Sequence, residues 1–133
     1  MRVREWMQPL PETATPEMPV AEAYRRMRRG GFRHLPVIEG GRLVGIVSDR
    51  DLPLARPEVA TPGSVQAADQ AMARLAVRDV MSREVTTVDP DRPVEEAARV
   101  MLDLRVGSLP VVDEGRLVGI LTETDLLRAW VSG

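Results

Sequence analysis

Two seven-residue motifs with one shared pattern are the part of this chain best suited to chemistry. They are G-I-V-S-D-R-D at 45–51 and G-I-L-T-E-T-D at 119–125. Each places a hydroxyl at the end of an apolar run and an aspartate about one turn into the helix that should follow. A helix N-terminus favours an anion such as phosphate. A carboxylate beside it can accept two hydrogen bonds from a ribose diol, as acidic residues do in dinucleotide folds.

A structural interpretation of the same residues stays open. Ser48 and Thr122 are good helix caps, and Asp51 and Asp125 would favour the helix dipole even without a ligand. The glycine of each motif allows either a ligand or another backbone to approach the strand. The occurrence of the motif twice in one register favours a pair of binding sites.

Catalysis and metal binding have little support in the composition. The chain has no cysteine and one histidine, His34, so we expect no thiolate chemistry, no metal site and no catalytic residue. The acidic pairs Asp49/Asp51 and Glu123/Asp125 could suggest carboxylate catalysis or a metal site, but a chain with one histidine and no cysteine gives either role little support. We therefore expect a protein that is not an enzyme.

The second half of the chain shows the elements that must position its motif. Val85–Val88, V-T-T-V, is a predicted strand, and apolar residues from Val94 to Leu102 follow a helical period. Leu109–Val112 and Leu117–Leu121 are predicted strands joined by a tight turn at 113–115. A last helix should begin after Thr122, which gives the order β-α-β-β-α.

The first half follows the same plan with one departure. A helix is predicted around 20–27, and strands at Leu35–Ile38 and Leu43–Val47 turn at 39–41. Prolines interrupt its first strand at 9–14, which should confine that segment to an edge or to irregular structure. Residues 53–76 join the halves, first as a proline-rich loop and then as an alanine-rich helix.

These two halves are copies of one another. Residues 3–59 align on 77–133 at a shift of 74 without a gap, with 23 of 57 positions identical. A tandem of two small units suggests one domain with a pseudo-two-fold axis and a cleft at that axis. We expect repeat 1 at 1–56, a linker with a helix at 57–76, and repeat 2 at 77–133.

The charge and hydropathy of the chain limit the classes of partner that it is expected to bind. With 18 basic and 20 acidic residues in 133, the net charge of −2 makes nucleic-acid binding an unfavoured function. No apolar run is long enough to span a bilayer, and the N-terminus has no signal-peptide pattern. We expect a cytoplasmic protein without a membrane partner.

The repeated motifs resemble those of a tandem CBS-domain pair, or Bateman module. The matching residues are V-R-E-W-M and V-R-D-V-M at each start, H-L-P-V-I and S-L-P-V-V, and both G-h-h-S/T-x-x-D motifs, where h is apolar. The chain is similar to stand-alone bacterial pairs, including the CBS portion of acetoin-utilisation regulatory proteins. The resemblance implies an α/β fold of two β-α-β-β-α repeats related by a pseudo-two-fold axis, and it implies that the protein is a homodimer.

The resemblance also implies a ligand and its contacts. The cleft of such a pair binds AMP, ADP, ATP or S-adenosylmethionine as a regulatory ligand, and the module acts as an energy or metabolite sensor for another protein. Asp51 and Asp125 would hold ribose, and Ser48, Arg50, Thr122 and Thr124 would line the ribose-phosphate region. Adenine would lie at Ile46 with Thr86, Thr87 and Val88, or at Ile120 with Thr13 and Ala14. Arg33 and His34 would reach phosphate.

The two sites are expected to differ. Arg33 and His34 have Gly107 and Ser108 as counterparts, and the interrupted strand of repeat 1 weakens the adenine wall of the Asp125 site. We therefore expect the Asp51 site to be the better formed. Two other functions stay open: a dimerisation or docking module with unused clefts, and a nucleic-acid or divalent-cation binder.

Overall fold

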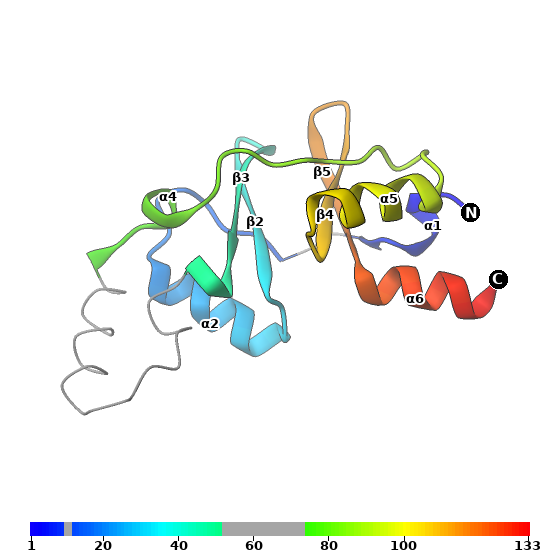
Figure 1. Cartoon of the computed structure of the whole chain (residues 1–133). Helices are drawn as coiled ribbons and strands as arrows, with labels where there is room; N and C mark the ends of the chain where they lie inside the picture. The colour runs from blue at the N-terminus through cyan, green and yellow to red at the C-terminus, as the bar shows by residue number, and fades with distance from the viewer. Residues whose placement is uncertain (10–11, 52–73) are drawn as a thin grey trace. The chain divides into compact units, whose positions relative to one another are not determined.

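Two units make up the computed structural model, which describes residues 1–9, 12–51 and 74–133 (Figure 1). Unit 1 contains Met1–Pro11, Gly41–Leu43 and Val85–Gly133, and unit 2 contains Glu12–Gly40 and Val44–Glu84. The proline-rich loop and most of the alanine-rich helix predicted between the repeats lie outside the described residues.

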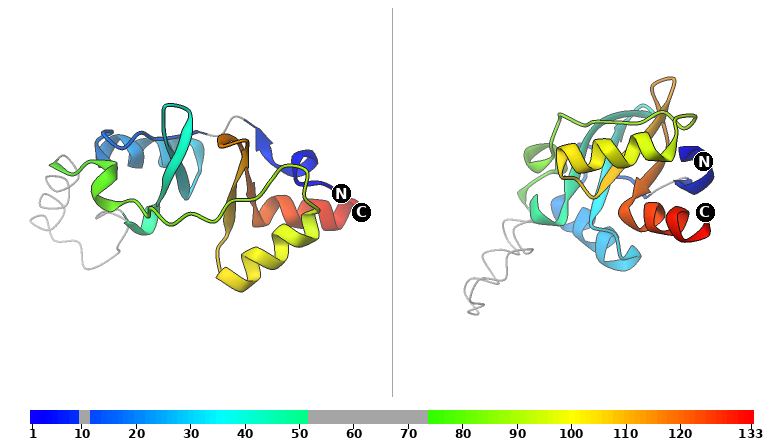
Figure 2. Two further views of the ribbon diagram at one scale, coloured as in Figure 1. Left: turned by 90° about the horizontal axis from the view of Figure 1, so that it is seen from above. Right: turned by 45° about the vertical axis from the view of Figure 1, so that its right-hand side comes forward.

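Unit 1 is built on three strands and three helices. Its elements are α1 (Val3–Trp6), β1 (Gln8–Pro9), α5 (Val94–Leu104), β4 (Ser108–Asp113), β5 (Arg116–Thr122) and α6 (Glu123–Ser132). Strand β5 pairs antiparallel with β1 on one side and with β4 on the other, in registers that place Gln8 opposite Ile120 and Leu109 opposite Leu121. Helix α5 contacts β4, and α6 contacts β5 (Figure 2).

Unit 2 repeats this plan. Its elements are α2 (Val20–Gly30), β2 (His34–Glu39), β3 (Arg42–Ser48, of which the first two residues are counted with unit 1), the 3-10 turn η1 (Asp49–Asp51) and α4 (Val77–Val80). Strands β2 and β3 are neighbours, and α2 contacts β2. The order of helices and hairpins therefore confirms the α/β repeat expected from the sequence.

Glycines make the hairpin turns possible. The β2–β3 turn has Gly40 and Gly41 at φ 61° and 81°, and the β4–β5 turn has Glu114 and Gly115 at φ 52° and 82°. Two successive residues with positive φ are typical of the turns whose twist matches that of antiparallel strands. Both hairpins thus form where the sequence predicted them.

Each unit has its own apolar core. In unit 2, Val20, Ala23 and Met27 of α2 pack with strand residues such as Leu35 and Val47. In unit 1, Ala97 and Met101 of α5 pack with Leu109 and Leu121. The apolar face predicted for α2 is therefore the face that the core buries. On α5 the core buries Val94, Ala97 and Met101, whereas Leu102, which was predicted on the same face, is 78% exposed.

The strand predicted at Val85–Val88 is wrong. Only Val88 is paired, through an isolated parallel bridge to Val111 in which Val88 N–H donates to Pro110 O at 3.0 Å and Val112 N–H donates to Val88 O at 3.0 Å. The next rung would need an N–H on residue 110 to reach Thr86, and Pro110 has none. The ladder therefore stops after one residue.

The first repeat shows the same single rung. Ala14 N–H donates to Pro36 O and Ile38 N–H donates to Ala14 O, both at 2.9 Å. Pro36 is the counterpart of Pro110, so it limits this copy in the same way. The expected contrast between an intact and an interrupted first strand is wrong, because the prolines of the L-P-V strands limit both copies.

The two repeats exchange their opening segments. Helix α1 begins repeat 1 but belongs to unit 1, where Val3 N–H donates to Arg92 O at 2.9 Å. Helix α4 begins repeat 2 but belongs to unit 2, where Val77 N–H donates to Met18 O at 2.8 Å. Each compact unit therefore needs residues from both repeats, which the local sequence pattern did not indicate.

Among the described residues, no helix is long and apolar enough to cross a membrane.

Candidate functional site

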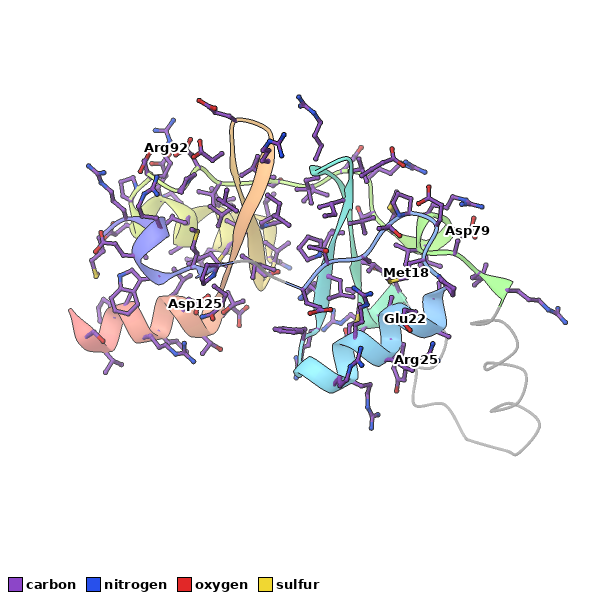
Figure 3. The ribbon with its side chains drawn as sticks, turned by 180° about the vertical axis from the view of Figure 1, so that it is seen from behind. Met18, Glu22, Arg25, Asp79, Arg92 and Asp125 are labelled. Atoms are coloured by element: carbon purple, nitrogen blue, oxygen red, sulfur yellow. The ribbon has the colours of Figure 1, made fainter. Side chains whose placement is uncertain are left out.

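The motif of unit 1 is a capped helix N-terminus with a fixed carboxylate. The Oδ2 atom of Asp125 accepts hydrogen bonds from Thr122 N–H at 2.8 Å and from Thr122 Oγ1 at 3.0 Å. Asp125 N–H in turn donates to Thr122 Oγ1 at 3.3 Å. This reciprocal capping box sets the start of α6 and holds the carboxylate in one orientation. Figure 3 labels Asp125 at the start of that helix.

The motif of unit 2 repeats the carboxylate geometry. The Oδ2 atom of Asp51 accepts from Ser48 N–H at 2.9 Å and from Ser48 Oγ at 3.0 Å. These distances match those at Asp125 within 0.1 Å. In both units one carboxylate oxygen is therefore committed to the cap, and the other is the atom able to accept from a ligand hydroxyl.

The two motifs differ in the surroundings of the second aspartate oxygen, Oδ1. The Oδ1 atom of Asp125 accepts from Gln8 Nε2 at 2.8 Å and lies 3.8 Å from Arg128 Nη1. Asp125 is 1% exposed, whereas Asp51 is exposed. Among the described residues, Asp51 has no hydrogen-bond partner other than Ser48. Sequence reasoning missed Gln8, although the aligned repeats show the signal: its counterpart is Ser82.

The motif glycines serve strand pairing. A Cβ built on Gly119 would lie 2.8 Å from Gln8 O, and one on Gly45 would lie 2.8 Å from Ser82 O. A contact this short cannot be relieved by moving a flexible side chain, because each neighbour is a backbone atom. Of the two interpretations left open by the sequence, close approach of a second backbone is the one observed.

Basic residues lie beside the motif of unit 2. Asp49 N–H donates to Arg33 O at 2.9 Å, which joins the start of β2 to the motif. Arg33 is exposed and His34 is half-buried. Burial lowers the pKa of His34, while Asp49 and Asp51 act in the opposite direction. His34 is therefore neutral near pH 7, where it can still donate a hydrogen bond.

The corresponding place in unit 1 lacks the basic side chains, because Gly107 and Ser108 stand where unit 2 has Arg33 and His34. Glu123 N–H donates to Gly107 O at 3.1 Å, the same backbone bond as in unit 2. A Cβ on Gly107 would lie 3.2 Å from Glu123 Oε1. A carboxylate therefore lies close to where the side chain of residue 107 would begin. Unit 2 has Asp49 as the counterpart of Glu123, so the difference for a phosphate is the presence of Arg33 and His34 in unit 2.

The family model for the CBS domain matches residues 3–55 and 77–132, which cover both copies of the motif. The chain belongs to the CBS domain family. It is a tandem CBS pair, as its sequence pattern predicted.

Solved CBS pairs have the same fold as this chain. CBSX2 from Arabidopsis thaliana is 31% identical, with a TM-score of 0.86 over 98% of this chain and 94% of that one. The acetoin utilization protein AcuB from Vibrio cholerae is 28% identical, with a TM-score of 0.81 over 99% and 91%. The CBS pair of protein MJ0100 is 28% identical, with a TM-score of 0.78 over 99% and 97%. The predicted likeness to AcuB is thus confirmed.

Some relatives carry a CBS pair within a longer protein. The inosine-5'-monophosphate dehydrogenase of Korarchaeum cryptofilum is 39% identical over 115 residues. That match covers 86% of this chain and 21% of the dehydrogenase. The chain therefore spans about a fifth of that enzyme's length.

The residues expected to hold adenine are distributed over the two units. In unit 1, Thr86 and Thr87 are exposed, and Val88 and Ile120 are 9% and 8% exposed. In unit 2, Ala14 is buried, and Thr13 and Ile46 are half-buried. Ile46 and Ile120 lie in the motif strands, and Ala14 and Val88 are bridged to the L-P-V strands at Val37 and Val111.

The remaining motif residues are open to solvent. Arg50 and Thr124, which precede the two aspartates, are exposed. Among the described residues, no group of three or more histidine, aspartate or glutamate side chains is placed to hold a metal ion.

Proposed function

We propose that this CBS pair is a non-enzymatic regulatory module that binds AMP, ADP, ATP or S-adenosylmethionine through its two aspartate motifs. The observation that carries the proposal is the duplicated carboxylate, fixed by two hydrogen bonds from a serine or threonine at matching distances in both units. A carboxylate held in this way loses little further freedom when it accepts hydrogen bonds from ribose hydroxyls.

Charge supports a phosphorylated ligand at the Asp51 motif. Arg33, Arg50 and the donor His34 are all in the same unit as Asp51. In the proposed complex Asp51 binds the ribose diol, Ser48 and Arg50 line the ribose-phosphate region, and Arg33 and His34 bind phosphate. Ile46 with Thr86, Thr87 and Val88 forms the adenine wall. Ile120, Thr13 and Ala14 have that role at the Asp125 motif.

Solved relatives support the ligand class. CBSX2 has been solved in complex with AMP, and that structure is 30% identical to this chain, with a TM-score of 0.82. The MJ0100 pair has been solved with 5'-methylthioadenosine and S-adenosyl-L-methionine. An adenosine group is common to these ligands, so the proposal extends that group to the present chain.

Calorimetric titration with AMP, ADP, ATP and S-adenosylmethionine tests this function. At least one compound should bind, and the double variant Asp51→Ala/Asp125→Ala should lose binding while its circular dichroism spectrum still shows a folded chain. Its melting temperature should fall, because both carboxylates also accept hydrogen bonds from the cap residues Ser48 and Thr122. Failure of all four compounds to bind or to raise the melting temperature at millimolar concentration would contradict the proposal. That result would favour a docking module with unused motifs.

We propose that the module is a homodimer and that ligand binding acts on a regulated protein through this dimer. Helices α5 and α6 contact one another and expose large apolar side chains, including Trp130 at 83% and Leu102 at 78% exposed. Water contact with such side chains is unfavourable, and their burial between two copies would relieve it. Light scattering should give twice the mass of one chain, and Trp130→Glu should halve it.

A further inference from the structure

A residue outside both motifs distinguishes the two carboxylates. We infer that Gln8 occupies the ligand-accepting oxygen of Asp125 and thereby makes the Asp125 motif the weaker of the two ligand sites. This inference rests on the proposed function, because it concerns how the two motifs share one class of ligand. It starts from the 2.8 Å hydrogen bond between Gln8 Nε2 and Asp125 Oδ1.

Backbone pairing places Gln8 in position for this contact. Gln8 in β1 lies opposite Ile120 in β5, and Pro9 lies opposite Gly119. Because Gly119 has no side chain, the β1 backbone comes close to β5, and Gln8 O lies 2.8 Å from the place of a Cβ on Gly119. From this strand the Gln8 side chain reaches across to Asp125 at the start of α6.

The hydrogen bonds of Asp125 leave little for a ligand. Oδ2 is bonded to Thr122, and Oδ1 is bonded to Gln8. The Asp125 side chain is only 2% exposed. A ribose diol would therefore have to displace the Gln8 amide, and the hydrogen bond lost in doing so would offset part of the binding free energy.

Unit 2 provides the natural comparison. Ser82, the counterpart of Gln8, is bridged to Ile46, the counterpart of Ile120. A Cβ built on Gly45 would lie 2.8 Å from Ser82 O, the same distance as for Gly119 and Gln8 O. The backbone arrangement is thus repeated, but the serine side chain is shorter, and its Oγ donates to Glu84 O at 3.4 Å. Asp51 stays exposed, and among the described residues its only hydrogen-bond partner is Ser48.

Reciprocal exchange of these two side chains tests the inference. In an Asp51→Ala background, AMP binding reports on the Asp125 motif alone. Adding Gln8→Ser to this background should tighten AMP binding about tenfold. This factor corresponds to the free energy of one hydrogen bond to a charged group. In an Asp125→Ala background Ser82→Gln should weaken AMP binding by a similar factor. Both exchanges insert a side chain that the other copy already has at the same backbone position. Gln8→Asn, which keeps the amide on a shorter stem, is a second variant and should also tighten binding.

The outcomes separate the inference from the proposed function. Tighter AMP binding by the Gln8 variants in calorimetry supports the inference. If the wild type binds AMP and both Gln8 variants bind no better than their parent, the inference alone is overturned. If neither the wild type nor Gln8→Ser binds any adenosine compound, the proposed function is overturned as well.

Discussion

The motif of unit 1 and the motif of unit 2 share a scaffold and differ in what surrounds it. Both have a hydroxyl residue that caps the following turn and fixes one aspartate oxygen. In unit 1 the other oxygen is bonded to Gln8 and residue 107 is a glycine, whereas in unit 2 the aspartate is exposed and the counterpart of Gly107 is Arg33. A duplication can thus conserve the backbone of a site while neighbouring side chains set its strength.

The largest expected effect is a loss of stability, and it tests whether the two units have equivalent cores. Leu35 and Leu109 occupy matching positions and are 0% and 1% exposed. Either Leu→Ala change should lower the free energy of unfolding by about 2–5 kcal/mol, through lost burial and a residual cavity. Urea denaturation measures both variants. A loss below 1 kcal/mol at one position would show that the two cores are not equivalent.

The next largest effect is a loss of ligand affinity, and it tests whether the Asp51 motif binds more tightly than the Asp125 motif. Asp51→Ala should weaken binding of the adenosine ligand by about 10- to 100-fold, because it removes charged hydrogen bonds to ribose. Asp125→Ala is the matched control and should change the high-affinity step by less than about twofold. Titration of both variants with AMP would refute the ranking if Asp125→Ala gave the larger loss.

A smaller effect tests the charge difference. Arg33→Gly, which copies Gly107, should weaken AMP binding roughly two- to fivefold, the range for one exposed ion pair. Adenosine binding should not change, because adenosine has no phosphate. Arg29→Ala removes one charge from α2 and should leave both ligands unaffected. Equal losses for AMP and adenosine in Arg33→Gly would argue against a phosphate role.

The smallest effect concerns His34, which has Ser108 as its counterpart. Burial lowers the pKa of His34 in the folded protein. As pH falls through the ordinary histidine pKa of about 6.5, the unfolded chain therefore takes up the proton first, and stability decreases. The melting temperature of the wild type should fall more between pH 7.5 and 5.5 than that of His34→Gln. Parallel curves for the two proteins would contradict this.

Local patterns predicted most of the repeated fold. The apolar faces of α2 and α5, both hairpins with their turns, and the Thr122 cap are each determined by residues close in sequence. Helices α1 and α4 were missed because each is a single turn, although Glu5 and Asp79 accept the N-cap N–H of Arg2 and Ala76.

Long-range pairing could not be predicted from one sequence. Val85–Val88 has strand-forming residues, but its ladder depends on the N–H that Pro110 lacks. The exchange of α1 and α4 between units depends on backbone bonds to residues far along the chain. The Gln8 contact with Asp125 spans 117 positions, and only the mismatch between Gln8 and Ser82 indicated a difference there.

A crystal structure of the wild-type protein grown with AMP tests the central claim most directly. We predict ribose hydroxyls within hydrogen-bond distance of the Asp51 carboxylate, with the phosphate beside Arg33 and His34. At AMP concentrations that fill only the Asp51 site, Gln8 should still be bonded to Asp125. AMP bound away from both aspartates, or on Asp125 while Asp51 is empty, would contradict the account.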